Sequence, residues 1–349
     1  MGSHTASAAR DKRSRRSHGG ITLAEVARLA GVSPITASRA LNTPEQVSAG
    51  ALQKVRDAVQ LTGYVPNLLA GGLASSRSRL VAAVVPAIGG GTVFMEMVQS
   101  LTESLATSGY QLMLGQSGYA QSREDALLDA IIGRRPDGLV LTGVMHSLQG
   151  RRRLQASGIP VVETWDLTPT PIDMLVGFSH ERVGTAVADY LHAKGRRRLA
   201  IMSGDDERAV RRTTAFVARA RSHLGADATL PSVAVGAPST VGSGRRAFAK
   251  LLDEHPDIDA LCCGSDVMAA GAIIEAQVRG MRVPADLAVI GFGDLGFSAD
   301  LHPALTTVRI DGTAIGRQAA SFIVERAAGR GVAERVVDIG FSIVERASA

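Results

Sequence analysis

The segment Ile21–Asn42, ITLAEVARLAGVSPITASRALN, contains two short helical patterns separated by a Gly-Val-Ser turn at 31–33. The first pattern opens with Thr22-x-x-Glu25, a capping box, and its apolar residues recur at the spacing of one helix face. The glycine can adopt the backbone of a tight turn, and the serine can cap a second helix that begins at Pro34. Two helices joined in this way place the second one in the DNA major groove. The segment therefore predicts a helix-turn-helix DNA-binding domain.

The positive charge of the chain is concentrated at its amino-terminal end. Residues 1–79 contain 11 Lys/Arg and 4 Asp/Glu, whereas the other residues contain 27 and 29. A cationic head on a nearly neutral body is typical of proteins that bind the phosphate backbone of DNA. Residues 1–20 have no apolar periodicity, so they predict a disordered basic arm.

Length and composition exclude several classes of protein. With 349 residues, 45% hydrophobic and 4% aromatic, the chain is long enough for more than one domain and rich in the residues of parallel α/β sheets. No apolar run approaches the roughly 20 residues that span a bilayer, and no secretory pattern precedes the head. The two cysteines, Cys262 and Cys263, lie in an apolar strand-like run and predict core thiols. We expect a cytoplasmic, nucleoid-associated protein that does not enter a membrane.

The DNA-binding domain is expected to span 21–66, with a hinge over 67–79. The sequence SAGALQKVRDAVQL predicts a serine-capped third helix that packs on the first two. A short helix over 68–75 would contain Gly71 and Gly72, each of which costs about 1 kcal/mol relative to Ala. Such a helix is not stable alone in water, so it would fold only when DNA and a partner chain supply contacts. An ordinary flexible linker is the alternative.

From residue 80 to residue 349, apolar strand patterns alternate with helical patterns. The strand patterns include LVAAVVP, YQLMLG, DGLVLTG, RRLAIMSG, ALCCGS and LAVIGF. The helical stretches include 94–107, 121–132, 181–194 and 265–278. This alternation is typical of βαβ units, and its length predicts two doubly wound parallel-sheet subdomains. The expected fold class is α/β with a small all-α head, and a ligand is expected at the carboxyl ends of the strands.

The head, with the YVPN that follows its third helix, closely resembles the lactose-repressor family of bacterial transcription regulators. The resemblance extends from Ile21 to about Glu345 and implies a homodimer on palindromic operator DNA, controlled by a small effector. It implies base reading by Arg39, which suits a guanine edge, and by Pro34 and Ile35, which offer apolar contacts. Phosphates or sugars would be contacted by Thr22, Ser33, Thr36, Ser38, Asn42 and Gln46.

The family also inserts paired hinge helices into the minor groove. Its wedge leucine maps to Leu73, with Ala70 beside it and Asn67 at the start of the segment. A leucine inserted between base steps kinks the duplex. The resemblance implies that effector binding changes the angle between the subdomains, separates the two hinge segments and melts the short helix.

The resemblance further implies that the two subdomains are those of periplasmic sugar-binding proteins. Crossovers between them are expected near 162–178, 290–293 and 307–312. No leucine heptads follow the last strand pattern, so we expect a dimer without a tetramerising tail.

The resemblance implies seven candidate residues at the effector cleft, of which Arg208 and Asp294 are included as sequence neighbours of matched positions. They are Phe94, Arg208, Arg212, Ser265, Asp266, Gly293 and Asp294. The usual family residue at 293 is an aspartate that holds neutral sugar hydroxyls or a base. Its loss from a pocket that keeps Arg212, with Arg208 and Arg211 nearby, makes the pocket electropositive and favours an anion.

The segments VIGFGD, SGDDER, PVVETWD and DIGFSIVER resemble the gluconate-repressor branch of the family. This resemblance implies that the effector is a sugar acid such as gluconate. The alternative is that Gly293 merely enlarges a pocket for a neutral sugar. A sugar phosphate or a purine is also left open.

No enzyme site is expected, and hence no catalytic residue, cofactor or metal. The segment GSGRRA at 242–247 fits the dinucleotide pattern G-x-G-x-x-A, but it does not directly follow a strand end, and glycines that open a helix explain it. No P-loop lysine, nucleophile elbow or metal-ligand spacing is found. His146, His180 and His192 are expected to be solvated or structural. A sugar-binding protein without DNA function is the competing class, and the head argues against it.

Overall fold

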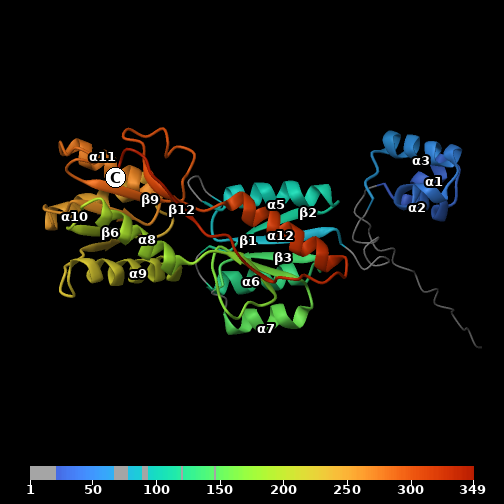
Figure 1. Cartoon of the computed structure of the whole chain (residues 1–349). Helices are drawn as coiled ribbons and strands as arrows, with labels where there is room; N and C mark the ends of the chain where they lie inside the picture. Colours follow the sequence, from blue (N-terminus) through green and yellow to red (C-terminus); the bar gives the residue numbers. More distant parts are fainter. Residues whose placement is uncertain (1–20, 67–77, 89–92, 119–120, 145–146) are drawn as a thin grey trace, which may run out of the picture. The chain divides into compact units, whose positions relative to one another are not determined.

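The computed structural model describes residues 21–66, 78–88, 93–118, 121–144 and 147–349 (Figure 1). The chain divides into two compact units, Met1–Ser76 and Arg77–Ala349, which we call the head and the core unit. The expectations for the basic arm at 1–20 and for a short helix at 68–75 lie outside the described residues. No helix in the described ranges is long and apolar enough to cross a membrane.

Over residues 21–66, the head consists of three α-helices and one 3₁₀ turn. These elements are α1 (Leu23–Ala30), α2 (Pro34–Asn42), η1 (Pro44–Gln46) and α3 (Ala49–Thr62). Thr22, Ser33 and Ser48 each accept a hydrogen bond from a backbone N–H in the first turn of the helix they precede. Gly31 ends α1 with a φ of 66°, the left-handed conformation expected of that turn. Small side chains fill the space between the helices: Val26, Ala27, Ala30, Ala37, Ala40, Val55 and Ala58.

The first lobe of the core unit contains a parallel sheet in the order β11-β5-β4-β3-β1-β2. Its strands are β1 (Leu80–Val85), β2 (Gln111–Gln116), β3 (Gly138–Thr142), β4 (Val161–Thr164), β5 (Met174–Gly177) and β11 (Val336–Asp338). Its helices are α5 (Met95–Thr107), α6 (Gln121–Ile132), α7 (Leu148–Ser157) and α12 (Gly312–Ala327). Figure 1 shows α5 and α12 along one face of this sheet and α6 and α7 along the other.

The second lobe contains a sheet in the order β12-β10-β9-β8-β6-β7, in which only β12 is antiparallel to its neighbour. Its strands are β6 (Leu199–Ser203), β7 (Ser232–Ala234), β8 (Ala260–Cys263), β9 (Ala288–Phe292), β10 (Thr306–Arg309) and β12 (Ser342–Val344). Its helices are α8 (His180–Ala193), α9 (Glu207–Leu224), α10 (Val241–Glu254) and α11 (Asp266–Val278). One pair, α8 and α9, packs on one face, and α10 with α11 packs on the other.

The sequence of the strands explains why both faces of each sheet are covered. In β1, Val81, Ala83 and Val85 belong to the apolar cluster that contains α5 and α12, whereas Ala82 and Val84 pack against α6 and α7. A strand with apolar residues at every position must be buried on both faces, as parallel α/β sheets are.

The chain crosses between the lobes three times. It leaves the first sheet after β5, returns after β10, and crosses again between β11 and β12. The segment 290–293, which the sequence suggested as a crossover, instead ends β9 within the second sheet. The third crossing lies between Asp338 and Ser342. Its flanking strands have three residues each, too short for a recognisable pattern.

Candidate operator and effector sites

Helix α2 presents an exposed amino-terminal end and an exposed arginine. Pro34 and Ile35 occupy its first turn, and Ile35 is 66% exposed, unusual for a large aliphatic residue. Arg39 follows one turn later and is also exposed. Within the described ranges, its guanidinium has no ion-pair partner. The three residues expected to read bases therefore lie on one helix with their side chains accessible.

The residues expected at the DNA backbone are engaged mainly in helix caps. Ser33 Oγ accepts from Thr36 N at 3.1 Å, and the two hydroxyls are 2.9 Å apart. The Asn42 amide donates to the backbone oxygen of Ser38 at 3.0 Å. Thr22 Oγ1 donates to Glu25 within its capping box, and Gln46 is exposed on η1. The positions expected in the minor groove, Asn67, Ala70 and Leu73, lie outside the described residues.

A cavity of about 170 Å³ lies in the core unit where the carboxyl ends of strands from both sheets meet. The first lobe contributes Phe94 and Trp165, and the second contributes residues that follow β6 and β8. Four of the expected effector residues line it: Phe94, Arg208, Arg212 and Ser265. Its other lining residues include Val93, Phe178, His180, Asp205, Asp206, Ser239, Met268 and Phe292. Its position agrees with the expectation for doubly wound sheets.

Arg212 is the central cation of the cavity. Its Nη1 lies 3.0 Å from His180 Nδ1, its Nη2 donates to Gly264 O at 3.4 Å, and its guanidinium lies 4.1 Å from the centre of the Phe292 ring. Burial lowers its pKa to about 10, so it stays charged at neutral pH. Among the described residues, no carboxylate forms an ion pair with it. Helices α8 and α9 pack closely here because residue 184 of α8 is a glycine. A Cβ at Gly184 would lie only 2.1 Å from the backbone oxygen of Arg212.

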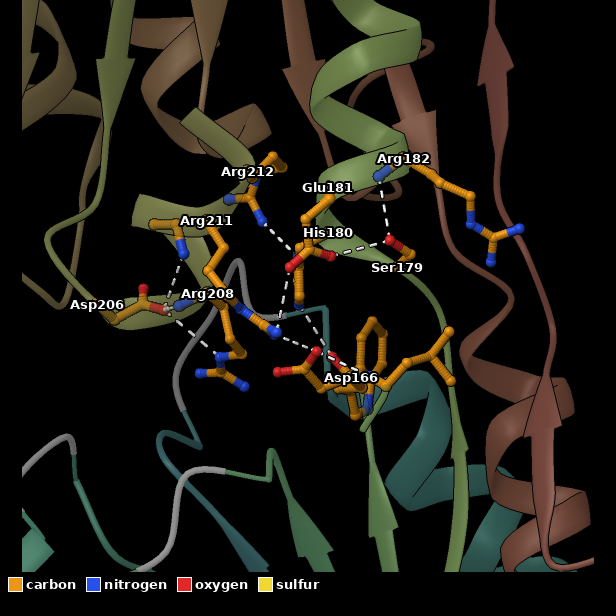
Figure 2. A network of polar contacts seen from close by, with 12 residues as sticks. Asp166, Ser179, His180, Glu181, Arg182, Asp206, Arg208, Arg211 and Arg212 are labelled. Carbon is orange, nitrogen blue, oxygen red and sulfur yellow. Dashed lines mark hydrogen bonds and ion pairs between the residues drawn. The ribbon is translucent and has the colours of Figure 1, made fainter. Parts of the chain in front are cut away.

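His180 is buried beside Arg212 and is held from both ring nitrogens. Its Nε2 lies 3.1 Å from the carbonyl of Trp165, and its Nδ1 faces the Arg212 guanidinium (Figure 2). Burial, and secondarily the charges of Arg212 and Arg208, lower its pKa to about 2. His180 is therefore neutral at physiological pH, with its proton on Nε2.

Arg208 lies one turn before Arg212 on α9 and faces the first lobe. Its Nε lies 3.4 Å from Asp206 Oδ1, and its guanidinium is 5.8 Å from the centre of the Phe94 ring. Asp206 caps α9, because the same oxygen accepts from the backbone N–H groups of Arg208 and Ala209. Its carboxylate is thus already bound by the start of α9.

An aromatic wall runs through the cavity from the first lobe to the second. Phe94 and Trp165 meet edge to face with centroids 5.2 Å apart, and Trp165 contacts Phe178 in the same way at 6.1 Å. Phe178 in turn lies 6.3 Å from Phe292. The cavity therefore combines an apolar aromatic wall with a few polar groups, as small-molecule sites do.

Arg211 connects the two lobes at the side of the cavity. It forms an ion pair with Asp166, which follows β4 of the first lobe, and a second one at 3.3 Å with Glu181 at the start of α8 (Figure 2). Burial raises the pKa of Asp166, and the positive charge of Arg211 opposes this shift. Arg211 does not line the cavity, and its charge is paired with carboxylates of the two lobes.

Three residues expected at the effector do not line the cavity. Asp266 is fully buried, and its carboxylate accepts from Leu295 N at 2.8 Å, Ser298 Oγ at 2.6 Å and Thr307 Oγ1 at 2.5 Å. It ties the β9–β10 loop to α11. Asp266 was expected at the effector because it follows Ser265, but its carboxylate is occupied by these three donors.

The other two lie beside it in the β9–β10 loop. Asp294 forms ion pairs with Arg309 and Arg346 rather than facing the cavity. Gly293 lies behind Val93, with a φ of +129°, and a Cβ there would come within 2.6 Å of Val93 Cγ1. Backbone conformation and close packing therefore both favour glycine at 293.

Sequence reasoning missed three lining residues that follow strand ends. His180, expected to be solvated or structural, is only 3% exposed and lines the cavity with Trp165 and Phe178. Trp165 directly follows β4, and Phe178 with His180 follows β5. The rule that ligands bind at the carboxyl ends of strands, applied to every strand rather than to family positions alone, would have found them.

Comparison with known proteins assigns the chain to a family. Residues 22–67 match the bacterial regulatory proteins of the lacI family, and residues 188–349 match the periplasmic binding protein-like domain. The HTH-type transcriptional regulator GntR of Pseudomonas aeruginosa is 38% identical over 340 residues, which cover 97% of this chain and 98% of that protein. This chain belongs to the lacI family of bacterial regulatory proteins. It is a DNA-binding transcriptional regulator, not an enzyme.

Further relatives of this lacI-family regulator agree in sequence and in fold. The regulator GntR of Escherichia coli is 30% identical over 92% of this chain and 96% of its own length. The structure of a lacI-family regulator from Silicibacter pomeroyi has a TM-score of 0.87 and 30% identity over 94% of this chain and 99% of that one. The regulator GntR from Chromobacterium violaceum has a TM-score of 0.73 and 34% identity over 77% of this chain and 98% of its own.

Proposed function

We propose that this lacI-family regulator is a homodimeric repressor of genes for sugar-acid use, and that a sugar acid such as gluconate binds the cavity of the core unit. One observation carries the choice of ligand. Arg212 places a buried guanidinium on the cavity wall with no carboxylate paired to it among the described residues.

A carboxylate would complete the surroundings of Arg212. A buried charge without a partner is costly, and a planar guanidinium suits the two oxygens of a carboxylate. His180 cannot supply the missing negative charge because an imidazole is either neutral or positive, and Asp206 is bound by the start of α9. The carboxylate of an aldonic acid would supply it, while its carbon chain lies along the aromatic wall.

The remaining lining groups suit hydroxyls. Ser239 and Ser265 lie 3.4 Å apart at the starts of α10 and α11, and Asp205 is exposed at the rim. Hydroxyl groups and backbone N–H groups at helix starts can bind a polyol. The cavity volume suits a small metabolite rather than a polymer.

On DNA, we propose that Pro34, Ile35 and Arg39 of each protomer read one half of a palindromic operator in the cytoplasm. The proposal for the hinge rests on sequence: Leu73 enters the minor groove, with Ala70 and Asn67 beside it. Effector binding would then be coupled to DNA through the angle between the lobes.

Calorimetry on the full chain with gluconate, 2-ketogluconate and glucose tests the ligand. We expect at least one of the two acids to bind at least tenfold more tightly than glucose, since a hydrogen-bonded charge contributes about 1.5–3 kcal/mol and 1.4 kcal/mol is tenfold. Arg212→Met, which keeps the volume of the side chain, should remove this preference and leave operator binding intact. Arg219→Ala, on the same helix but paired with Asp189, is the matched control and should bind like the wild type.

Two outcomes would contradict the ligand proposal. One is tight binding of glucose or of a purine with no response to either acid. The other is an acid preference that survives in Arg212→Met, which would place the anion elsewhere in the core unit. A sugar phosphate that binds more tightly than the unphosphorylated acids would replace sugar acid as the effector class.

A further inference from the structure

A second cavity, of about 460 Å³, lies at the opposite end of the second sheet from the effector cavity. Its walls come from the segments that lead into β6, β7 and β8, so it lies at the amino-terminal edge of parallel strands whose carboxyl ends line the first cavity. Two arginines and two histidines line it, namely Arg197, Arg198, His223 and His255. Asp257 is the one carboxylate in this lining.

The two arginines are poorly neutralised. Arg197 Nη1 donates to the carbonyl oxygens of His192 and Arg196, both at 2.9 Å, and not to a carboxylate. Arg198 approaches Asp259 only at 3.8 Å and its side chain is 60% exposed. The Asp259 carboxylate is instead bound by the backbone N–H groups of residues 197 and 198, at 3.0–3.2 Å.

His223, which lines this cavity, shares its carboxylate partner with an arginine. The rings of His192 and His223 stack in parallel, with centroids 4.1 Å apart. Asp189 contacts His223 Nε2 at 2.6 Å, and it also accepts from Arg219 at 2.6 Å, so a single carboxylate serves both side chains. Burial lowers the pKa of His192, and the charges of Arg197 and His223 act in the same direction.

We propose that this second cavity is an anion site for a phosphorylated small molecule, separate from the effector cavity. Arg197 and Arg198 would bind the phosphate, with His223, His255 and the hydroxyl of Thr229 available as further donors. The volume exceeds that of a bare phosphate and leaves room for an attached sugar. A ligand there would contact three connecting segments of the second lobe at once.

Titration calorimetry with glucose 6-phosphate and with inorganic phosphate tests the site. The full chain carries Arg212→Met, so that the effector cavity does not capture the probe. We expect saturable binding of one glucose 6-phosphate per chain, weakened at least tenfold by the double substitution Arg197→Gln and Arg198→Gln. The matched control, Arg246→Gln with Lys250→Gln, removes two exposed cations of α10 and should change the affinity less than twofold. Binding of inorganic phosphate alone would identify free phosphate as the ligand.

Arg198→Gln alone keeps the test decisive if the double variant does not fold, because this side chain lies mostly in solvent. It should weaken binding of the probe at least threefold with an unchanged thermal transition. Three results would overturn the proposal: no saturable binding, an equal loss in the control pair, or an unchanged affinity without Arg197 and Arg198. The proposal would also be overturned if the substitutions weakened operator binding but left the affinity for glucose 6-phosphate unchanged. Arg197 and Arg198 would then contact the DNA backbone instead.

Discussion

Arg212 and His180 form a pair in which the arginine can only donate and the histidine must accept. Arg212 Nη1 lies 3.0 Å from His180 Nδ1, and the other ring nitrogen donates to Trp165 O at 3.1 Å. An arginine has no acceptor atom, so this arrangement requires the neutral imidazole with its proton on Nε2. His180 therefore orients the Arg212 guanidinium at the cavity without adding a charge of its own.

The neutral state of His180 predicts a pH dependence of stability. Its native pKa of about 2 lies below the ordinary value of 6.5, so below pH 6.5 the unfolded chain binds a proton that the native chain does not. Neutral His180 makes its full contribution to the free energy of unfolding above pH 6.5. This contribution is lost progressively as the pH falls below that value. The slope is at most about 1.4 kcal/mol per pH unit.

Urea unfolding of the wild type and of His180→Gln at pH 7 and pH 5 measures this effect. A glutamine can still donate to Trp165 O and accept from Arg212, but it does not titrate. Between pH 7 and pH 5, we expect His180→Gln to lose less unfolding free energy than the wild type, by up to about 2 kcal/mol. An identical loss in both proteins would show that His180 does not carry the pH dependence.

Gly293 predicts a stability effect that is independent of the ligand. Its φ of +129° is open to glycine alone among common residues, and an added Cβ would come within 2.6 Å of Val93 Cγ1. Gly293→Ala should therefore destabilise the core unit by about 1–3 kcal/mol. Gly296→Ala, in the same loop with no atom within 4 Å of the added Cβ, is the matched control and should be nearly neutral.

The same strain limits what Gly293→Asp can reveal about the effector. The substitution would add like charge near a bound acid, but it would also distort the loop behind Val93. Adding Val93→Ala to Gly293→Ala separates the two sources of strain, because it removes the contact with Val93 and leaves the φ unchanged. If Gly293→Ala is as stable as the wild type in thermal unfolding, backbone strain is not the reason for glycine here.

Features that depend on residues close together in sequence are predicted better than features that depend on residues far apart. The helices of residues 21–66 are predicted from the sequence, because caps such as Ser33-Pro34 and turn residues such as Gly31 act within about four residues of their own position. Helices of the core unit are located to within a residue or two for the same reason. The stretches 181–194 and 265–278 correspond to α8 and α11.

The cavity is predicted less well because its walls come from separate strands. Arg208 and Arg212 share one helix and were found, whereas Trp165 and His180 meet only through the order of the strands in the first sheet. Asp266 shows the opposite error. A residue adjacent to a cleft position in sequence turns its carboxylate into the sheet, and only the contacts with Ser298 and Thr307 reveal this.

The role found for Asp266 predicts a change in stability rather than in ligand choice. Its two oxygens accept from three donors, so Asp266→Ala would leave the backbone N–H of Leu295 and the hydroxyls of Ser298 and Thr307 without this acceptor. A buried unpaired donor costs about 1–3 kcal/mol, which urea unfolding should register. The ratio of gluconate to glucose affinity should stay that of the wild type. A changed ratio in a protein of wild-type stability would return Asp266 to the effector site.

Arg39 predicts a loss of base discrimination rather than of general DNA affinity. Its side chain is exposed on α2, one turn after Ile35, with no ion-pair partner in the described part of the chain. A bidentate contact to a guanine edge contributes about 1–3 kcal/mol of discrimination, so Arg39→Ala should weaken operator binding by that amount and relax the preference at one base pair in each half-site.

The measurement compares operator and random duplex at one salt concentration, since phosphate contacts depend on salt. Arg28→Ala, which removes an exposed cation from α1 of the same head, is the matched control. Any effect of that substitution should be equal on both duplexes. If Arg39→Ala also weakens both duplexes equally, Arg39 contacts phosphate, and base reading falls to Pro34 and Ile35 at the start of α2.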